Sequence, residues 1–324
     1  MSHTEVDNLE RVLRFVRKHS TVPLSIDTEG GRLRTGLMSD RVTLFSGATV
    51  RLVAEAFWGD DYTIPILPGT AIADLEPGTH VSLDFGSVLL RVDKVVDGSA
   101  DATVLSGGEV GSRKAVTAFP SPKLPSFSPK DRVATKIALE CGVREFAVSF
   151  CENAEAIQQF REMAGAGCTV VAKVESREGV RNFDQILASA DKILIDRGDL
   201  SREVRIEGVP LLQKALIHRA NEKQIPVYVA TNLLESMVTH PTPSRAEVND
   251  VLNTLIDGAD GLVLAAETAI GRYPVEAARM IASLLREYHR SLEGYDFDRL
   301  LGDHPLASLG SQQANKSEGS GHPG

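Results

Sequence analysis

Two polar strings, KVESREG at residues 173–179 and IDRGDLS at residues 195–201, decide the fold, because each begins at the end of an apolar run. Buried strands that end in charged residues are typical of the active-site face of an α/β barrel. Lys173 and Glu175 are two positions apart, so their side chains point to the same side of a strand or its end. Arg197 and Asp199 close the next run. We therefore expect two neighbouring strand ends to bring an ammonium, a guanidinium and two carboxylates together.

This group of residues predicts a site for a divalent metal ion and an anion. Carboxylate oxygens suit hard cations such as Mg2+ or Mn2+, and no sulfur or imidazole ligand accompanies them here. The alternative is a surface cluster of salt bridges, which would contribute little to stability.

Length and composition fit an acidic protein with one main domain and an additional part. The chain has 324 residues, 42% of them hydrophobic, and a formal net charge of −9. A single barrel of about 250 residues fits this length. Lys and Arg are scattered, so we expect no nucleic-acid partner. No apolar run reaches the roughly 18 residues of a membrane span, so we expect no membrane association. The three cysteines lack metal-ligand spacing, which fits a cytoplasmic protein.

The chain alternates strand and helix patterns, with one interruption. Alternating apolar strands and helices imply parallel pairing, and about six strands can be counted where a closed (β/α)8 barrel has eight. We therefore predict an α/β fold, a TIM-type barrel that is incomplete at its N-terminus, formed by residues 1–37 and 120–290. Short β-branched runs and turn signals predict a small all-β insertion at 38–119. The polar residues 291–324 predict a disordered tail.

A series of strings follows one another along the chain: SIDTEGGRLRTG, DFGSVLLRV, GGEVGSRKAV, KVESREGV, DRGDL, VYVATNLLESM, THPTPSRAEVNDV and DGADGLVLAAETAIGRYPVEAARM. In this order and at this spacing they resemble the pyruvate kinase family, over roughly residues 20–290. The resemblance implies that the all-β insertion is the lid domain of that family, placed after the third barrel strand. It also implies that the first two barrel strands and the carboxy-terminal regulatory domain are missing.

The resemblance assigns catalytic roles to two residues and metal binding to two others. Lys173 matches the lysine that stabilises the enolate oxygen, and Thr231 matches a threonine near the site of proton transfer. Glu175 and Asp199 match the carboxylates that hold the divalent ion. A further set matches positions that bind substrate or nucleotide: Arg34 for phosphate, Arg197, Gly198, Asp196 and Asn232 around the substrate, and Asp84 in the lid.

The chain also departs from the family pattern. Asp27 and Thr28 match ligands of the monovalent ion K+, but the segment that supplies two more has no counterpart, so only half of that site is expected. Asp196 stands where the family has alanine, and Asn232 where it has glutamine. A carboxylate near trianionic phosphoenolpyruvate is unfavourable by roughly 1 to 4 kcal/mol at about 4 Å.

Three functions remain open at this point. The first is a pyruvate kinase-like enzyme that transfers a phosphoryl group between phosphoenolpyruvate and ADP, giving pyruvate and ATP with Mg2+. The second is a metal-dependent lyase, aldolase or decarboxylase that acts on a 2-oxo acid through an enolate. The third is a binding protein without catalysis. Because an incomplete barrel exposes strand edges, we also expect a homo-oligomer.

Overall fold

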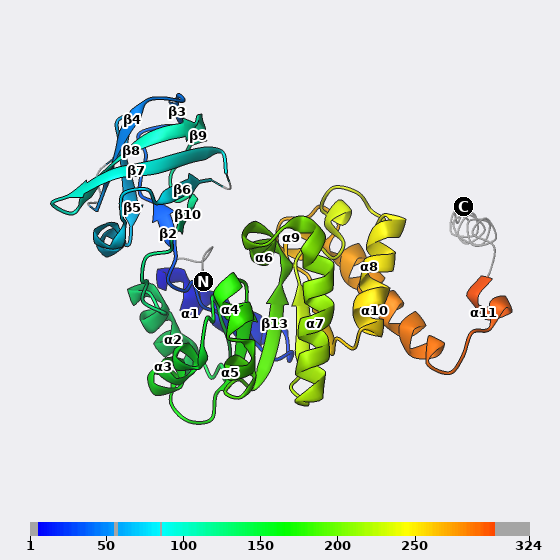
Figure 1. Cartoon of the computed structure of the whole chain (residues 1–324). Coiled ribbons are helices and arrows are strands. Elements are labelled where there is room, and N and C mark those ends of the chain that lie inside the picture. Colours follow the sequence, from blue (N-terminus) through cyan, green and yellow to red (C-terminus); the bar gives the residue numbers. More distant parts are fainter. Residues whose placement is uncertain (1–5, 55–57, 85, 302–324) are drawn as a thin grey trace, which may run out of the picture. The chain divides into compact units, whose positions relative to one another are not determined.

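A computed structural model describes residues 6–54, 58–84 and 86–301, in two compact units (Figure 1). The first unit comprises the chain up to Asn232 together with Asp257–Val263. The second comprises Leu233–Ile256 and the chain from Leu264 onward. Each unit is described by itself below.

The first unit contains a parallel sheet of six strands, which confirms the α/β class and the strand count expected from the sequence. Within the described residues this sheet is open, so it forms part of a barrel without closing one. Neighbouring strands pair in the order in which they follow in the chain: β1 (Ser25–Asp27), β11 (Glu145–Val148), β12 (Thr169–Val174), β13 (Lys192–Asp196), β14 (Val227–Ala230) and β15 (Gly261–Val263).

Helices lie between these strands in the chain and share a hydrophobic core with one face of the sheet. The second helix begins with Ser128 as N-cap and Pro129 at the first position, and Ser128 and Asp131 form a reciprocal capping box. The helices of the first unit are α1 (Val6–His19), α2 (Pro129–Glu140), α3 (Ala154–Ala164), α4 (Arg177–Arg181), α5 (Phe183–Leu187), α6 (Arg197–Glu203) and α7 (Val209–Glu222), with the 3-10 turn η2 (Ile206–Gly208).

The two-residue period of the strands separates the core from the functional face. Along β12, Val170, Ala172 and Val174 are buried in the core shared with the helices. Val171 belongs to a smaller apolar cluster with residues of β11, β13 and β14. Lys173 alternates with the first set, so it lies on the same face as Val171. On the same face, Glu145 and Lys192 pair at the amino ends of β11 and β13, whereas Lys173 and Asp196 lie toward the carboxyl ends of their strands.

The first unit also contains a closed β-barrel with its own apolar core, which includes the fully buried Leu52, Ile64 and Leu90. Its first strand begins at Leu33, before the predicted start of the insertion at residue 38. The barrel strands are β2 (Leu33–Thr35), β4 (Thr49–Val53), β5 (Thr63–Leu67), β6 (His80–Leu83), β7 (Val88–Val96), β8 (Ser99–Ser106) and β10 (Ala115–Phe119), accompanied by the pair β3 (Val42–Leu44) and β9 (Gly108–Val110) and the 3-10 turn η1 (Gly69–Asp74).

The second unit is helical. Its elements are η3 (Glu235–Val238), α8 (Arg245–Ile256), α9 (Ala266–Ala269), α10 (Pro274–Ser291) and α11 (Phe297–Leu301). The short helix α11 falls inside the stretch predicted to be a disordered tail, and residues 302–324 of that stretch lie outside the described residues. The predicted domain boundaries at 37/38, 119/120 and 290/291 remain predictions.

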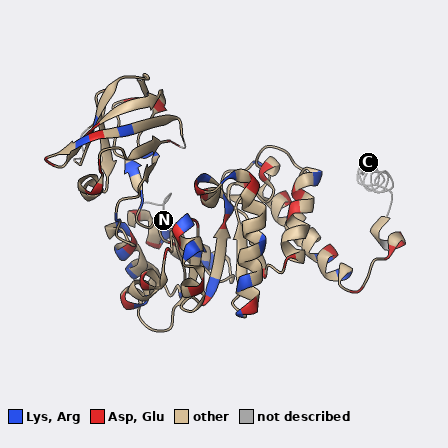
Figure 2. Ribbon diagram, viewed as in Figure 1, with Lys and Arg blue, Asp and Glu red and all other residues tan. Residues whose placement is uncertain are grey.

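Acidic and basic residues are interspersed along the helices and strands (Figure 2). In the part of the chain that the structure describes, no helix combines the length and the apolar character needed to cross a membrane.

Candidate active site at the carboxyl ends of the parallel strands

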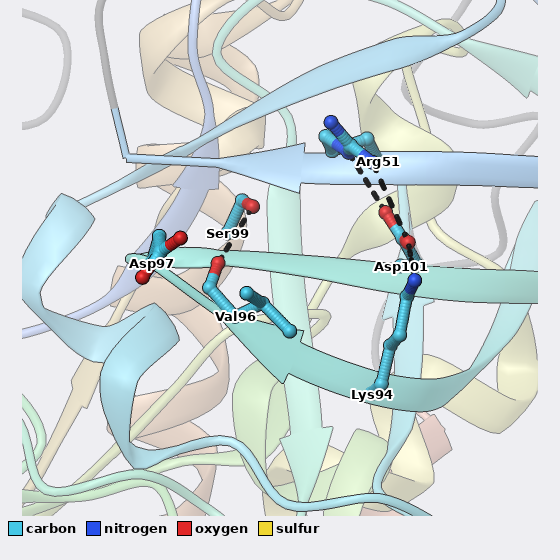
Figure 3. A pocket seen from close by; sticks show the side chains of 6 residues that line it. All are labelled: Arg51, Lys94, Val96, Asp97, Ser99 and Asp101. Carbon is cyan, nitrogen blue, oxygen red and sulfur yellow. Dashed lines mark hydrogen bonds and ion pairs between the residues drawn. The ribbon is translucent and has the colours of Figure 1, made fainter.

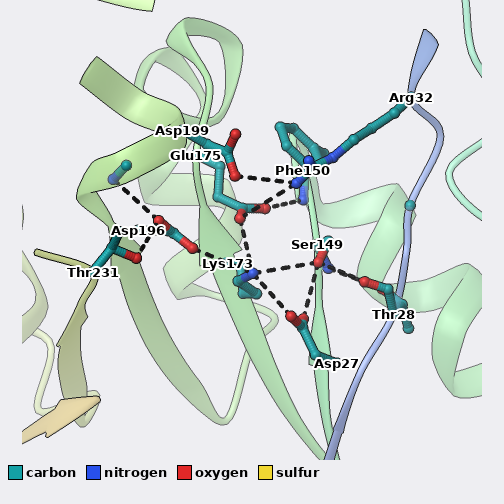
Figure 4. A network of polar contacts seen from close by, with 12 residues as sticks. Asp27, Thr28, Arg32, Ser149, Phe150, Lys173, Glu175, Asp196, Asp199 and Thr231 are labelled. Carbon is teal, nitrogen blue, oxygen red and sulfur yellow. Dashed lines mark hydrogen bonds and ion pairs between the residues drawn. The ribbon is translucent and has the colours of Figure 1, made fainter. Parts of the chain in front are cut away.

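The centre of the candidate site is the ammonium group of Lys173, near the end of β12 (Figure 4). Its side chain is 9% exposed, and Nζ lies 2.9 Å from Glu175 Oε1, 3.2 Å from Asp27 Oδ2 and 3.4 Å from Asp196 Oδ2. We call the group of Asp27, Lys173, Glu175, Asp196 and Asp199 the strand-end cluster. It joins residues from β1, from β12 and the position directly after it, from the end of β13 and from the first turn of α6, as expected for carboxyl ends of adjacent parallel strands.

Burial and ion pairing act in opposite directions on the charges of this cluster. Burial alone would lower the pKa of Lys173, but the carboxylates of Glu175, Asp27 and Asp196 outweigh it, so the pKa is raised. Burial likewise opposes ionisation of Asp196, yet the charge of Lys173 and the hydroxyl of Thr231 lower the pKa of that carboxyl. Lys173 and Asp196 are therefore both charged at neutral pH.

Glu175 is the most deeply buried carboxylate of the cluster, with 1% of the residue exposed. Its Oε2 accepts a hydrogen bond of 2.7 Å from the backbone N–H of Phe150. Its Oε1 accepts no hydrogen bond, although the ion pair with Lys173 is close. Burial raises the pKa of Glu175 to about 7, against the opposing effect of the Lys173 charge. Oε1 of Glu175 therefore pairs with the Lys173 ammonium and, because no hydrogen bond ends on it, keeps lone-pair capacity for a second cation.

The oxygen atoms of three carboxylates converge closely enough to hold a metal ion. Ligand atoms of Glu175, Asp196 and Asp199 all lie within 4.8 Å of one another. An all-oxygen set that includes a buried oxygen without a hydrogen bond fits Mg2+ or Mn2+. The structure therefore brings together the two predicted metal-binding residues, Glu175 and Asp199. It also adds Asp196, which the sequence had placed with the substrate.

Arg32 also belongs to this site, and sequence reasoning did not identify it. From the segment after β1 it reaches toward two carboxylates, with Nη2 3.2 Å from Asp199 Oδ2 and 3.9 Å from Glu175 Oε1 (Figure 4). Its guanidinium carbon lies 3.6 Å from the centre of the Phe150 ring. The string SIDTEGGRLRTG contained the signal, a second basic residue two positions before Arg34.

Asp27 and Thr28 lie at the end of β1, and Ser149 connects them. The hydroxyl of Ser149 donates to Asp27 Oδ1 at 3.0 Å and to the carbonyl of Thr28 at 2.7 Å. The backbone N–H of Ser149 donates to Thr28 Oγ1 at 3.0 Å. Ser149 is a further site residue that the sequence did not indicate. Asp27 also pairs with Lys173, so this pair of residues borders the strand-end cluster directly.

Thr231 follows β14 in a backbone conformation that is rare for a β-branched residue, with φ of 75°. The guanidinium of Arg197 stabilises it by donating to the Thr231 carbonyl at 2.9 and 3.1 Å. Arg197 also donates to the carbonyl of Asn232, an exposed residue with φ of 56°. Backbone strain of this kind persists only where surrounding contacts enforce it. Arg197 therefore holds the turn that presents the Thr231 hydroxyl.

The Thr231 hydroxyl faces the cluster through Asp196. It donates to Asp196 Oδ1 at 2.8 Å, and the same oxygen accepts from the N–H of Gly198 at 3.1 Å, as the N-cap of α6. A Cβ at Gly198 would lie only 2.7 Å from Thr231 Cγ2. Glycine is therefore required by close packing at this position, and its N–H serves the helix cap.

The other two predicted residues make their contacts within the β-barrel. Asp84 Oδ2 lies 3.1 Å from Lys114 Nζ, and Arg34 donates to the carbonyl of Arg113 at 3.2 Å. Burial, followed by the nearby charge of Arg32, lowers the pKa of Arg34. These residues keep their predicted ligand roles as proposals.

The β-barrel also carries a hollow of about 230 Å³ (Figure 3). The two cations that line it, Arg51 and Lys94, both pair with Asp101. Asp101 is therefore shared by both cations, and Asp97 is a second carboxylate in the lining. Its lining consists of Arg51, Lys94, Val96, Asp97, Ser99 and Asp101.

Fold and site together define an α/β protein of the barrel class, with a β-barrel insertion and a carboxylate-rich site at the strand ends. Comparison with known proteins identifies the family. The family model "Pyruvate kinase, barrel domain" matches residues 1–278. The chain belongs to the pyruvate kinase family, as the sequence motifs indicated.

Individual relatives agree with this assignment. The chain is 37% identical over 280 residues to a pyruvate kinase of Thermococcus litoralis, an alignment that covers 85% of this chain and 59% of the relative. It is 35% identical over 289 residues to one from Geobacillus stearothermophilus, covering 86% and 49%. It is 32% identical over 283 residues to one from Thermotoga maritima, covering 86% and 60%. The chain thus spans between about half and 60% of the length of these relatives.

Proposed function

We propose that this protein transfers a phosphoryl group between phosphoenolpyruvate and ADP, giving pyruvate and ATP, with a divalent metal ion. The observation that carries the proposal is the convergence of Lys173, Glu175 and Asp199 at adjacent strand ends, in a member of the pyruvate kinase family. An ammonium beside carboxylates that can hold a metal ion is the arrangement needed to bind an oxo acid and stabilise its enolate.

Lys173 and Thr231 have the catalytic roles in this proposal. The Lys173 ammonium is fixed by three carboxylates and stays charged, so it is suited to stabilise negative charge on the enolate oxygen. The Thr231 hydroxyl, held by the strained turn, is suited to the proton-transfer side. Gly198, Asp196, Asn232 and Arg197 form or support the substrate end, and Arg34 and Asp84 are proposed to contact phosphate and nucleotide.

Glu175 and Asp199 are proposed to hold Mg2+ or Mn2+, with Asp196 beside them. When bound, the ion supplies Lewis-acid polarisation of the oxo-acid oxygens. We propose Asp27 and Thr28 as ligands of K+, because the chain belongs to the pyruvate kinase family. The sequence led us to expect only half of the ligands of this ion.

The test is a coupled assay of the purified protein with phosphoenolpyruvate, ADP, MgCl2 and KCl, followed for pyruvate and ATP. Glu175→Gln is the matched variant, because it keeps the shape of the side chain and removes the charge that would bind the metal. We expect turnover by the native protein and its loss in the variant. Absence of turnover in the native protein across a range of Mg2+, Mn2+ and K+ concentrations would reject the proposal.

The relatives do not favour the two alternatives, a 2-oxo acid lyase and a binding protein without catalysis. Oxaloacetate and a 4-hydroxy-2-oxo acid, tested in the same assay, examine the lyase alternative. Product from these compounds, without pyruvate from phosphoenolpyruvate, would replace the kinase proposal.

We also propose a homo-oligomer in the cytoplasm. The edge strands β1 and β15 each pair with one strand among the described residues, and open edges are commonly covered by another chain. The three cysteines are free, which is usual in a reducing compartment. Light scattering after size-exclusion chromatography tests the assembly, and a monomer at micromolar concentration would contradict it.

A further inference from the structure

The position of Arg32 raises a question that the proposed chemistry leaves open. Its Nη2 approaches Asp199 Oδ2 and Glu175 Oε1, which are oxygen atoms of the two carboxylates proposed to bind the metal. A Mg2+ ion requires its ligands at about 2.0–2.1 Å in near-octahedral geometry. A guanidinium at the distances observed competes with a metal ion for the same oxygens. The two cations would also repel each other.

The contacts of Arg32 are specific enough to hold it there. The Phe150 ring lies under the guanidinium at 3.6 Å, and the backbone N–H of the same residue donates to Glu175. Phe150 therefore positions both the arginine and the carboxylate that the arginine approaches. The segment that carries Arg32 is anchored as well, since the N–H groups of Glu29 and Gly30 donate to the buried Asp131 at 2.6 and 3.1 Å.

The contacts are nevertheless weak enough to be exchanged. The side chain of Arg32 is 21% exposed, its Nε is buried without a hydrogen-bond partner, and its distance to Glu175 is long. The strand-end cluster has four carboxylates and the single cation Lys173, a formal charge of −3. Arg202, which pairs with Asp199 Oδ1 at 2.6 Å, reduces this charge to −2, and Arg32 reduces it to −1. A dication in place of Arg32 would neutralise the cluster further.

We propose that Arg32 is a tethered counter-cation that occupies the divalent-metal position and must move aside before the metal binds. This inference rests on the metal site of the proposed function. Arg32 lowers the apparent metal affinity and keeps the carboxylates in place when the metal is absent. It is a positioning residue and takes no part in the reaction.

The test measures Mn2+ binding directly, from the loss of the electron paramagnetic resonance signal of free Mn2+. We expect Arg32→Gln to bind Mn2+ about tenfold more tightly than the native protein, a change equivalent to about 1.4 kcal/mol. Arg32→Lys keeps the charge and should bind close to the native affinity. Arg181→Gln, which removes an exposed arginine paired with Glu178, is the matched control and should bind as the native protein does.

A second readout is thermal unfolding with and without Mn2+. Without metal, Arg32→Gln should melt at a lower temperature than the native protein, because its carboxylates have lost a counter-cation. Saturating Mn2+ should then raise the melting temperature of the variant by more than it raises that of the native protein. If Arg32→Gln does not fold, Phe150→Leu loosens the arginine without removing it, and we expect Mn2+ binding about threefold tighter, with RT ln 3 being about 0.65 kcal/mol.

The outcomes separate this inference from the proposed function. Equal or weaker Mn2+ binding by Arg32→Gln, together with loss of binding in Glu175→Gln, would reject the role of Arg32 and leave the metal site standing. No specific binding in the native protein or in any variant would reject the metal site and the inference together.

Discussion

The ammonium of Lys173 lies 2.9 Å from Oε1 of Glu175, and the two side chains come from the same side of one strand end. This pair is buried with two further carboxylates near the ammonium. The burial of this charge network indicates that the fold depends on this lysine.

Lys173→Met is therefore expected to reduce both activity and stability. Loss of the charge that faces the enolate should lower kcat by at least about 10²-fold. Leaving buried carboxylates without their cation should lower the free energy of unfolding by about 3–5 kcal/mol. Lys192→Met is a matched control, because Lys192 lies on the neighbouring strand and pairs with Glu145 while partly exposed. Urea unfolding measures the free energy of unfolding of both variants. A Lys173→Met variant as stable as the native protein would show that the buried charges contribute little to stability.

Asp196 offers a test of the electrostatics on the substrate side. Asp196→Asn keeps an oxygen that can cap α6 but removes one negative charge beside Lys173. Oxalate is a dianion that mimics enolpyruvate, and less repulsion should tighten its binding by about tenfold, or about 1.4 kcal/mol. This lies within the roughly 1 to 4 kcal/mol expected for the repulsion between two like charges at about 4 Å. Calorimetric titration in saturating Mg2+ measures this.

The control for this change is Asp184→Asn, which removes an exposed carboxylate paired with Arg219 and should leave oxalate affinity unchanged. Weaker oxalate binding by Asp196→Asn would mean that Asp196 helps to hold the metal, as its place among the three converging carboxylates allows.

The sequence predicted the features of the site that depend on local periodicity. Because side chains alternate along a strand, the spacing of Lys173 and Glu175 was enough to place them together, and the polar end of the next apolar run located Asp199. Contacts between distant segments were beyond such reasoning. Arg32 meets Asp199 across 167 positions, and Ser149 meets Asp27 across 122, so both contacts depend on the folded sheet. The hydrogen bonds of Arg197 to the carbonyl of Thr231 depend on it as well.

The three cysteines should differ sharply in reactivity. Cys151 is fully buried, and burial raises the pKa of its thiol to about 12, so it holds almost no thiolate at pH 8. Cys168 is also buried, whereas Cys141 is partly exposed. We expect a disulfide reagent such as DTNB to modify one thiol rapidly in the folded protein and all three after unfolding. Cys141→Ser should abolish the rapid phase, and a rapid phase that survives this change would contradict the assignment.

Glu247 links the stability of the second unit to pH. It lies in the first turn of α8, where its carboxylate accepts from the N–H of Ser244 at 2.7 Å, and the Ser244 hydroxyl accepts from the N–H of Glu247 at 3.3 Å. This is a reciprocal capping box. Ser236 also donates to Glu247 from its backbone at 2.6 Å and from its hydroxyl at 2.5 Å. Although partial burial opposes it, these hydrogen bonds lower the pKa of Glu247 below the ordinary 4.5.

A carboxylate whose pKa is lower in the folded state stabilises the protein above its unfolded pKa, and this stabilisation is lost as pH falls through the folded pKa. We therefore expect Glu247→Ala to lower the free energy of unfolding by about 1 kcal/mol at about pH 7. The difference from the native protein should begin to shrink as the pH falls below about 4.5, the ordinary pKa of a glutamate, and should vanish once the pH has passed the lowered pKa of Glu247. Glu287→Ala, which removes an exposed carboxylate on α10 paired with Arg290, should cost less than about 0.5 kcal/mol. Chemical unfolding at several pH values measures these differences, and a cost of Glu247→Ala that is the same at pH 7 and pH 3 would show that capping by the charged carboxylate is not its origin.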